Sequence, residues 1–233
     1  MEGAGNDYVY VDARHLDKDW PSVARSISDR HFGVGSDGLI LFLPSSKADM
    51  RMRMFNADGS EGEMCGNGIR CLVKFALERG LVRASDGAVR VETAAGIRTV
   101  FPIYKDGRVW GARVNMGKPI LRPEEVPVKV EGHHGEGPLM DYPLKVGRRT
   151  LPVTCVSMGN PHAVCFIKQP VASFPLHTIG PLVEHHPMFP RRVNFEIVNV
   201  LDRKHIRARV WERGSGETMA CGSGACAIGV AAR

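Results

Sequence analysis

The chain has 233 residues, 43% of them hydrophobic and 24% charged, which is typical of a globular protein and excludes wholesale disorder and a fibre. The formal net charge of +6 is scattered along the chain, and only 7% of the residues are aromatic, without the basic–aromatic alternation that stacks bases. We therefore expect no nucleic-acid partner, and the charge fits a small anionic or zwitterionic substrate.

The expected location follows from the apolar segments and the cysteines. No apolar run reaches about 18 residues, so no membrane contact is predicted. Met1-Glu2-Gly3-Ala4 lacks the basic and then apolar stretch of a secretory signal. We expect a cytoplasmic protein, in which six cysteines serve as thiols, ligands or catalysts rather than as a disulfide scaffold.

Three strands are predicted in the first half of the chain, at residues 8–12, 39–43 and 50–55. The third alternates methionines with Arg51 and Arg53, which gives the strand one apolar and one solvated face. Residues 206–210 repeat this alternation in the second half and predict a similar strand.

Helices are predicted at three places. Asp19 is a candidate N-cap with Pro21 just inside the first turn. From Ile69, apolar residues recur at i+3, i+4, i+7 and i+8, and Gly80 suits the end of that helix. A third helix, near the end of the chain, has a stripe of mostly small residues at Ala225, Ile228, Gly229 and Ala232. Such side chains predict very close packing on the neighbouring elements.

A domain boundary is expected in the middle of the chain. A hairpin is predicted over residues 89–100, with its turn near Ala95-Gly96. Glycine and proline then end a strand within residues 116–119. Because the chain is long enough for two small domains, we predict an N-terminal half over residues 1–117 and a C-terminal half over residues 118–233.

The two halves repeat one another. The offset of 156 residues from Arg51 to Arg207 aligns residues 51–68 with 207–224 without a gap. It pairs the sequence CGNG, which starts at Cys65, with CGSG, which starts at Cys221. A shorter echo pairs Gly5-Asn6 with Gly159-Asn160. Two CGxG sequences in one register indicate related halves, each with one such cysteine.

Both of these cysteines lie where a loop enters a predicted helix. Backbone N–H groups at a helix N-terminus are unpaired, and the helix dipole is positive there. The glycines let the backbone approach a ligand closely. Such a site lowers the pKa of a thiol and also binds a carboxylate. The alternative is that both are buried cysteines in tight turns.

A pair of thiols on opposite faces of one small molecule suits the inversion of a stereocentre. Duplicated halves usually face each other across a pseudo-twofold axis, so we expect the two loops to converge on one cleft. One thiolate would remove a proton from a carbon acid, and the other thiol would return a proton from the opposite face. A redox pair is an alternative. A metal site is disfavoured, because Cys65 with Cys71 and Cys221 with Cys226 lack the usual C-x₂-C spacing of zinc ligands.

Short motifs run in order from one end of the chain to the other. They are GAGNDY at 3–8, NADGSE at 56–61, CGNGIRC at 65–71, GNPH at 159–162, ERGSGET at 212–218 and ACGSGAC at 220–226. Together they resemble the diaminopimelate epimerase family. Proline racemases share the fold and a cysteine pair, but the ERGSGET run is similar to the epimerases.

The resemblance implies a fold and an activity. The implied fold is α/β, with two pseudo-symmetric halves, each a mixed, barrel-like sheet wrapped around a central helix. The implied activity is that of an isomerase that uses no cofactor, neither pyridoxal phosphate nor metal, and converts LL- to meso-diaminopimelate. This step precedes lysine and peptidoglycan precursors. The family also favours a homodimer.

The motifs carry over site residues. Cys65 and Cys221 are the expected acid–base pair, and the direction of reaction decides which one is the base. The expected substrate-binding residues are Asn6, Asn56, Gly66, Asn67, Asn160, Asn194, Glu212, Arg213, Gly222 and Ser223. Amide side chains suit an amino-acid substrate because they donate to a carboxylate and accept from an ammonium group. Backbone amides of the two loops are expected to stabilise the enolate-like charge that builds as the α-proton leaves.

Charged residues are expected to tune the two thiols. His162 and Glu212 match the family residues with this role, since an imidazolium favours thiolate and a carboxylate favours thiol. Glu212 and Arg213 are also expected to bind the ammonium and carboxylate of the substrate, Arg213 through a bidentate contact. The other histidines, including His133, His134, His185 and His186, are expected at the surface.

The chain departs from the family pattern at several places. Gly38 stands where some members carry a glutamine ligand and is assigned no role, and Ser223 replaces a frequent threonine while keeping the hydroxyl. Only 12 residues follow Cys221, whereas the first half continues to residue 117. We therefore expect a fragment that lacks about 40 C-terminal residues and a few N-terminal ones, with unpaired sheet edges.

Two other functions stay open. A related cofactor-independent amino-acid racemase would retain both cysteines and differ in the residues that hold the distal end of the substrate. A non-enzymatic thiol sensor would instead join Cys65 and Cys221 in a reversible disulfide.

Overall fold

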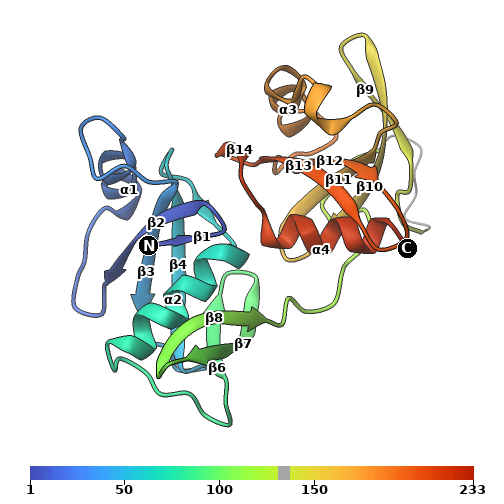
Figure 1. The fold of residues 1–233 in the computed structure, drawn as a ribbon. Helices are drawn as coiled ribbons and strands as arrows, with labels where there is room; N and C mark the ends of the chain where they lie inside the picture. Colours follow the sequence, from blue (N-terminus) through green and yellow to red (C-terminus); the bar gives the residue numbers. More distant parts are fainter. Residues whose placement is uncertain (131–136) are drawn as a thin grey trace. The chain divides into compact units, whose positions relative to one another are not determined.

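The computed structural model describes residues 1–130 and 137–233, in two compact units, Met1–Gly117 and Lys118–Arg233 (Figure 1). Each unit is a curled sheet with helices packed on it, so the expected α/β class is confirmed. His185 is exposed and His186 is half-buried, while His133 and His134 lie outside the described residues. In the part of the chain that the structure describes, no helix is long and apolar enough to cross a membrane.

The sheet of the first unit has the strand order β1-β2-β3-β4-β6-β7-β8, with β5 paired to β4. Its strands are β1 (Glu2–Gly3), β2 (Asn6–Asp12), β3 (Gly38–Leu43), β4 (Met50–Asn56), β5 (Glu61–Gly62), β6 (Val89–Thr93), β7 (Gly96–Lys105) and β8 (Arg108–Val114). Its helices are α1 (Trp20–Ser28) and α2 (Gly66–Glu78). The three strands, the two helices and the hairpin predicted for this half are confirmed.

Strand β3 separates two cores in this unit. Ile40 and Phe42 point toward α2, where they join a cluster with Ile69 and Leu72. Leu39 and Leu41 point to the other face, against α1. This alternation of period two lets a fully apolar strand bury both faces. Helix α2 packs on this curled sheet, in contact with β1, β2, β3, β7 and β8 (Figure 1).

The sheet of the second unit has the order β14-β13-β12-β11-β10-β9. Its strands are β9 (Tyr142–Val146), β10 (Arg149–Ser157), β11 (Pro161–Phe166), β12 (Asn194–Val200), β13 (Ile206–Glu212) and β14 (Gly216–Thr218). Its helices are the short 3₁₀ helix η1 (Val171–Ser173), α3 (Leu176–Glu184) and α4 (Gly222–Ala231). A cluster of apolar side chains fills the space between this sheet and α3, and α4 packs on β10, β11 and β12.

The repeat read from the sequence is confirmed by the strand pairing. In the first unit β2 pairs parallel with β3, and β3 pairs antiparallel with β4. In the second unit β11 and β12 are the parallel pair, and β12 pairs antiparallel with β13. Even one ion pair is repeated: Arg53 binds Glu61 through two nitrogens, and Arg209 binds Glu217 in the same way.

Two predicted apolar faces of the second half are buried only in part, at Val210 and Ile228. In β4 the methionine face is buried, but in the equivalent β13 Ile206 is 41% exposed and Ala208 is exposed. Both strands pair with two equivalent neighbours, but β4 also pairs with β6, and its methionines are buried in the cluster formed with α2. In α4, Ala225 and Gly229 of the predicted stripe are exposed. The buried positions are Ser223, Gly224, Ala227 and Ile228. Because this helix is apolar all round, the sequence left its orientation open.

Candidate functional site

Cys65 and Cys221 occupy the same structural position in their units. Each is the N-cap residue of a helix, with φ −125° and ψ 116° at Cys65 and φ −116° and ψ 117° at Cys221. The Gly68 N–H donates to Cys65 Sγ at 3.3 Å, and the Gly224 N–H donates to Cys221 Sγ at 3.4 Å. Each thiol therefore takes the place of the oxygen that usually caps a helix, and each lies at the positive end of a helix dipole.

The last glycine of each CGxG sequence permits close packing of helix on sheet. A Cβ atom at Gly68 would lie 2.3 Å from Ile40 Cδ1, and one at Gly224 would lie 2.7 Å from Glu196 Oε1. Real Cβ atoms do not come so close to other atoms, so only glycine fits without displacement. Ile40 on β3 and Glu196 on β12 therefore lie at equivalent positions, each against the first turn of the helix that its cysteine caps. One is apolar and the other is a carboxylate.

Asn6 is the polar neighbour of Cys65. The Cys65 S–H donates to Asn6 Oδ1 at 3.5 Å, and Asn6 Nδ2 donates to Asp37 Oδ2 at 2.6 Å. Behind the loop, the Tyr10 hydroxyl donates to the carbonyl of Gly68 at 3.2 Å, and burial raises the pKa of Tyr10. The first thiol thus has the amide side chain of Asn6 beside it, and Tyr10 supports its loop.

The other predicted site residues of this unit lie in the loops around α2. Gly66 and Asn67 form its buried first turn, where Asn67 Oδ1 accepts from Arg70 Nη2 at 2.7 Å. Asn56 ends β4 and is 8% exposed, and its Nδ2 donates to Ser60 Oγ at 3.0 Å. The structure brings Asn6, Gly66 and Asn67 to the thiol, and gives Asn56 a partner in the β4–β5 turn.

The second thiol has charged neighbours. Burial raises the pKa of Cys221 well above its ordinary value, and the carboxylates of Glu212 and Glu196 raise it further. The hydroxyl of Ser223, 3.4 Å from Sγ, and the Gly224 N–H act in the opposite direction. The balance keeps Cys221 protonated at neutral pH.

Glu212 lies at the end of β13 beside this thiol. Burial raises the pKa of Glu212, whereas hydrogen bonds from Thr218 and Cys221 and the nearby His162 lower it. The Thr218 hydroxyl donates to Glu212 Oε1 at 2.5 Å. Thr218 of β14 therefore fixes the carboxylate of Glu212, one of the two residues expected to tune a thiol.

His162 is fully buried and bonds through both ring nitrogens. Nδ1 lies 2.7 Å from Glu196 Oε1, and Nε2 lies 3.0 Å from Asn160 Oδ1. Glu196 is also fully buried, and its Oε2 has no hydrogen-bond partner among the described residues. Glu196 was not predicted from the sequence. A signal was available, since the offset of 156 places this acid opposite Ile40, between the apolar residues Phe195 and Ile197.

Asn194 and Arg213 connect the loops behind Cys221. Asn194 Nδ2 donates to the carbonyl of Pro161 at 2.9 Å, and its Oδ1 accepts from the Arg213 N–H at 3.0 Å. Arg213 Nη1 donates to the carbonyl of Arg191 at 3.1 Å. Both ends of the Asn194 side chain thus bind backbone, an arrangement that positions the loops.

Glu184 is a second acidic residue that the sequence analysis missed. It is buried at the end of α3, and its carboxylate accepts from Trp211 Nε1 at 2.7 Å and from the Gly214 N–H at 3.0 Å. These bonds fix the chain on either side of Glu212 and Arg213. No motif predicted Glu184, because its partners Trp211 and Gly214 are distant from it in the sequence.

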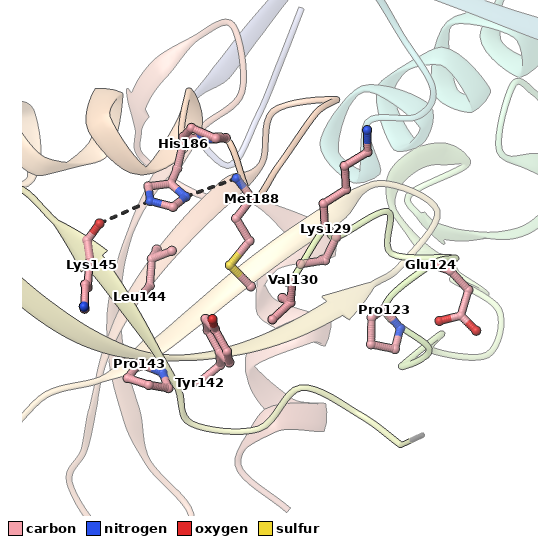
Figure 2. Close-up of a pocket in the computed structure, with 12 residues that line it drawn as sticks. Pro123, Glu124, Lys129, Val130, Tyr142, Pro143, Leu144, Lys145, His186 and Met188 are labelled. Atoms are coloured by element: carbon pink, nitrogen blue, oxygen red, sulfur yellow. Dashed lines mark hydrogen bonds between the residues drawn. The ribbon is translucent and has the colours of Figure 1, made fainter. Parts of the chain in front are cut away.

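Two of the cavities in the second unit differ in their relation to the candidate site. One, of about 410 Å³, is lined by Cys221, Glu196 and Thr218 together with apolar residues of β13 and α4. The other, of about 810 Å³, lies beside Tyr142 and Met188, and none of the predicted site residues lines it (Figure 2). Within residues 1–130 and 137–233, no group of three or more His, Cys, Asp and Glu side chains could hold a metal ion.

Comparison with known proteins gives consistent results. The family model described as diaminopimelate epimerase matches residues 1–121 and 154–233. The diaminopimelate epimerase of Acetivibrio thermocellus is 51% identical over 232 residues, which are 99% of this chain and 80% of that protein. The diaminopimelate epimerase of Moorella thermoacetica is 52% identical over 233 residues, which are 99% of this chain and 81% of that protein.

Solved structures resemble the chain in fold alone. A probable proline racemase from Agrobacterium radiobacter K84 aligns with a TM-score of 0.67 at 15% identity, over 100% of this chain and 77% of that one. A PhzF-family phenazine biosynthesis protein from Bacillus anthracis aligns with a TM-score of 0.61 at 19% identity, over 99% and 75%.

Proposed function

This chain belongs to the diaminopimelate epimerase family, and from that membership we propose that Cys65 and Cys221 interconvert LL- and meso-diaminopimelate as a cofactor-independent acid–base pair. One observation carries the proposal: both thiols cap helices with the same backbone geometry, at equivalent positions of two related halves. A structural cysteine needs no such duplicate. An isomerase that inverts a carbon centre needs one proton carrier on each face.

The proposed reaction breaks and forms one C–H bond. A thiolate takes the α-proton, and the electron pair of the C–H bond passes into the carboxylate as enolate-like charge. The thiol on the other face then gives its proton to the carbon, so that a thiol and a thiolate remain with their positions exchanged. Backbone N–H groups in the first turns of α2 and α4, at Gly66, Asn67, Gly222 and Ser223, would stabilise the transient charge.

The two thiols start from different protonation states in this proposal. Burial and two carboxylates raise the pKa of Cys221, so Cys221 enters as the acid. When Cys221 is the acid, Cys65 is the base, and the two cysteines exchange these roles in the reverse reaction. The substrate contacts that we propose beyond the loops are Asn6, Asn56, Asn160, Asn194, Glu212 and Arg213, with His162 and Glu212 tuning the thiols.

Isotope exchange tests the proposal. The reduced protein is incubated with LL-diaminopimelate in D₂O, and deuterium at the α-carbon is followed by mass spectrometry and NMR. We expect deuterium to enter as meso product forms, and the same rate after dialysis against EDTA. A thiol sensor would give no deuterium. A racemase of another specificity would label a different amino acid, such as proline or histidine, under the same conditions.

We also propose that the protein works in the cytoplasm as a homodimer. The presence of six thiols and no disulfide among the described residues supports a reducing compartment. The homodimer comes from the family resemblance. Light scattering coupled to size-exclusion chromatography would give about twice the 25.5 kDa chain mass for a dimer, and cell fractionation would test the location.

A further inference from the structure

Asn6 is held in one orientation by a carboxylate. Asp37 accepts from Asn6 Nδ2 at 2.6 Å, from the Asp7 N–H at 3.1 Å and from Arg30 Nη2 at 2.9 Å. An ionised carboxylate only accepts hydrogen bonds, so the NH₂ end of the Asn6 side chain must face it. The carbonyl end is then left to face Cys65, whose S–H it accepts.

Asn160 is the residue equivalent to Asn6, and its partner is of the opposite kind. Asn160 Oδ1 lies 3.0 Å from His162 Nε2, while Glu196 occupies Nδ1 of the same ring at 2.7 Å. Both ring nitrogens therefore face oxygen atoms. This pattern is satisfied when Nε2 carries a proton and a second proton is shared between Nδ1 and Glu196. The carbonyl end of Asn160 is then occupied, and its NH₂ end turns away from the histidine.

From this contrast we infer that Asp37 in the first unit and the Glu196–His162 pair in the second are positioning residues that hold two equivalent asparagines in opposite orientations. Asn6 offers an oxygen acceptor at Cys65, and Asn160 offers its NH₂ donors. Neither Asp37 nor Glu196 belongs to the motif residues assigned above. The inference deepens the proposed function, on which it rests for the identity of the two reacting thiols.

The orientation of Asn6 has a consequence for Cys65. A carbonyl oxygen next to Sγ stabilises the S–H form, whereas an NH₂ group in its place would stabilise the thiolate. The groups near this thiol also include the Gly68 N–H, which favours thiolate, and Tyr10, whose pKa burial raises. Asp37 thus acts on Cys65 through Asn6, and releasing Asn6 should make Cys65 more reactive.

Alkylation of the two thiols tests this without turnover. Wild type and Asp37→Ala are treated with iodoacetamide at pH 7, and modification of Cys65 and Cys221 is followed by peptide mass spectrometry. We expect Cys65 to react about threefold faster or more in the variant, relative to Cys221 in the same molecules. An unchanged ratio would overturn the role of Asp37.

The matched control is Asp7→Ala. Asp7 binds the same Arg30, at 2.8 Å, but its carboxylate does not bond Asn6. Removing the Asp7 carboxylate takes away a similar negative charge and should leave the alkylation rate of Cys65 relative to Cys221 unchanged. An equal acceleration in both variants would show that charge alone is responsible, and would overturn the inference.

A second variant, Asn6→Ala, keeps the inference testable if Asp37→Ala fails to fold. Asn6→Ala removes the oxygen acceptor directly and should also accelerate Cys65. Where Asp37→Ala does fold, its addition to Asn6→Ala should give no further acceleration, because Asp37 acts only through Asn6. An Asn6→Ala variant that alkylates like wild type contradicts the inference on its own.

The second unit is tested on the wild-type protein. A long-range ¹H–¹⁵N spectrum of histidine side chains, with His162 assigned through bonds from its own backbone, reports which ring nitrogens carry protons. We expect a proton on Nε2 at pH 7. An unprotonated Nε2 would require Asn160 to donate to it, and the two asparagines would then not be opposed. Because these measurements need no epimerisation, they succeed or fail independently of the deuterium experiment.

Discussion

At the scale of single residues, the site combines identical backbone with unlike side chains. The two N-cap cysteines have the same dihedral angles and the same N–H donor three residues on. Their surroundings differ because Ile40 stands behind one helix turn and Glu196 behind the other. A carboxylate near a thiol favours the protonated form. Glu196 therefore raises the pKa of Cys221, whereas the equivalent position behind the first loop holds the apolar Ile40.

Removal of either thiol should abolish epimerisation. Cys65→Ala and Cys221→Ala each take away the proton carrier of one face, so we expect at least about a thousandfold loss of kcat, measured by meso product formation. Cys71→Ala and Cys226→Ala are the controls, with activity kept and a packing cost of about 1–3 kcal/mol in urea unfolding. A Cys65 or Cys221 variant within tenfold of wild type would be incompatible with the two-base reaction.

Neutralising Glu212 should change the reactivity of Cys221. The Glu212 carboxylate raises the pKa of this thiol, so Glu212→Gln lowers the pKa and increases the thiolate fraction at pH 8. We expect faster alkylation of Cys221 by iodoacetamide, with Cys65 unchanged in the same sample, and slower epimerisation. Slower alkylation of Cys221 would mean that Glu212 stabilises the thiolate instead.

At the scale of elements, close contacts between helix and sheet hold the loops. The first turn of α2 lies against β3 and that of α4 against β12, with glycine at each contact. Helix α3 performs a related task from the other face, because its Glu184 binds the chain on both sides of Glu212 and Arg213. The position of the candidate site residues therefore depends on side chains far from them in sequence.

A pair of glycine substitutions tests this packing. A Cβ at Gly180 in α3 would lie 2.5 Å from the Trp211 ring, so Gly180→Ala should destabilise the protein by about 1–3 kcal/mol. A Cβ at Gly229 in α4 would have no atom within 4 Å. Gly229→Ala should therefore stabilise the protein by about 0.5–1 kcal/mol, which is the difference in helix propensity between the two residues. Urea unfolding measures both, and equal effects of the two variants would refute the close contact.

At the scale of the whole molecule, buried thiols link stability to pH. Burial raises the pKa of Cys155 and of Cys165 to about 12, from an ordinary value near 9.0. Below pH 9 these thiols are protonated in both states and contribute no pH dependence. Between pH 9 and 12 the unfolded chain releases their protons while the native protein keeps them. The unfolded state then binds fewer protons, so the free energy of unfolding falls as the pH rises.

The expected slope is about 1.4 kcal/mol per pH unit for each such thiol. Urea unfolding of the reduced protein at several pH values from 8.5 to about 10.5 measures it. Cys155→Ala removes one titrating group, so its slope should be shallower than that of wild type by this amount, whatever its stability at pH 8.5. If the free energy of unfolding fell equally steeply with pH in both proteins, Cys155 would ionise equally in the folded and unfolded states.

The sequence by itself predicted part of the elements, though not β9 to β12 or α3, and the equivalence of Cys65 and Cys221. Alternating and helical spacing predicted β4 and α2, and the offset of 156 residues aligned Cys65 with Cys221, because each pattern lies within a short segment. Local spacing also places each cysteine at a helix N-terminus. These features depend on residues within a few positions of one another, where propensity and periodicity decide the structure.

Only the tertiary structure decided the partners of these residues. Glu196 meets His162 across two parallel strands, Asp37 meets Asn6 across 31 positions, and Glu184 reaches Trp211 from another element. The orientation of α4 was also undetermined, since a helix that is apolar all round offers no preferred face to the sequence. Contacts between distant segments depend on which surfaces pack together, and the packing of β12 against α4 is what brings Glu196 to the first turn of that helix, beside Cys221.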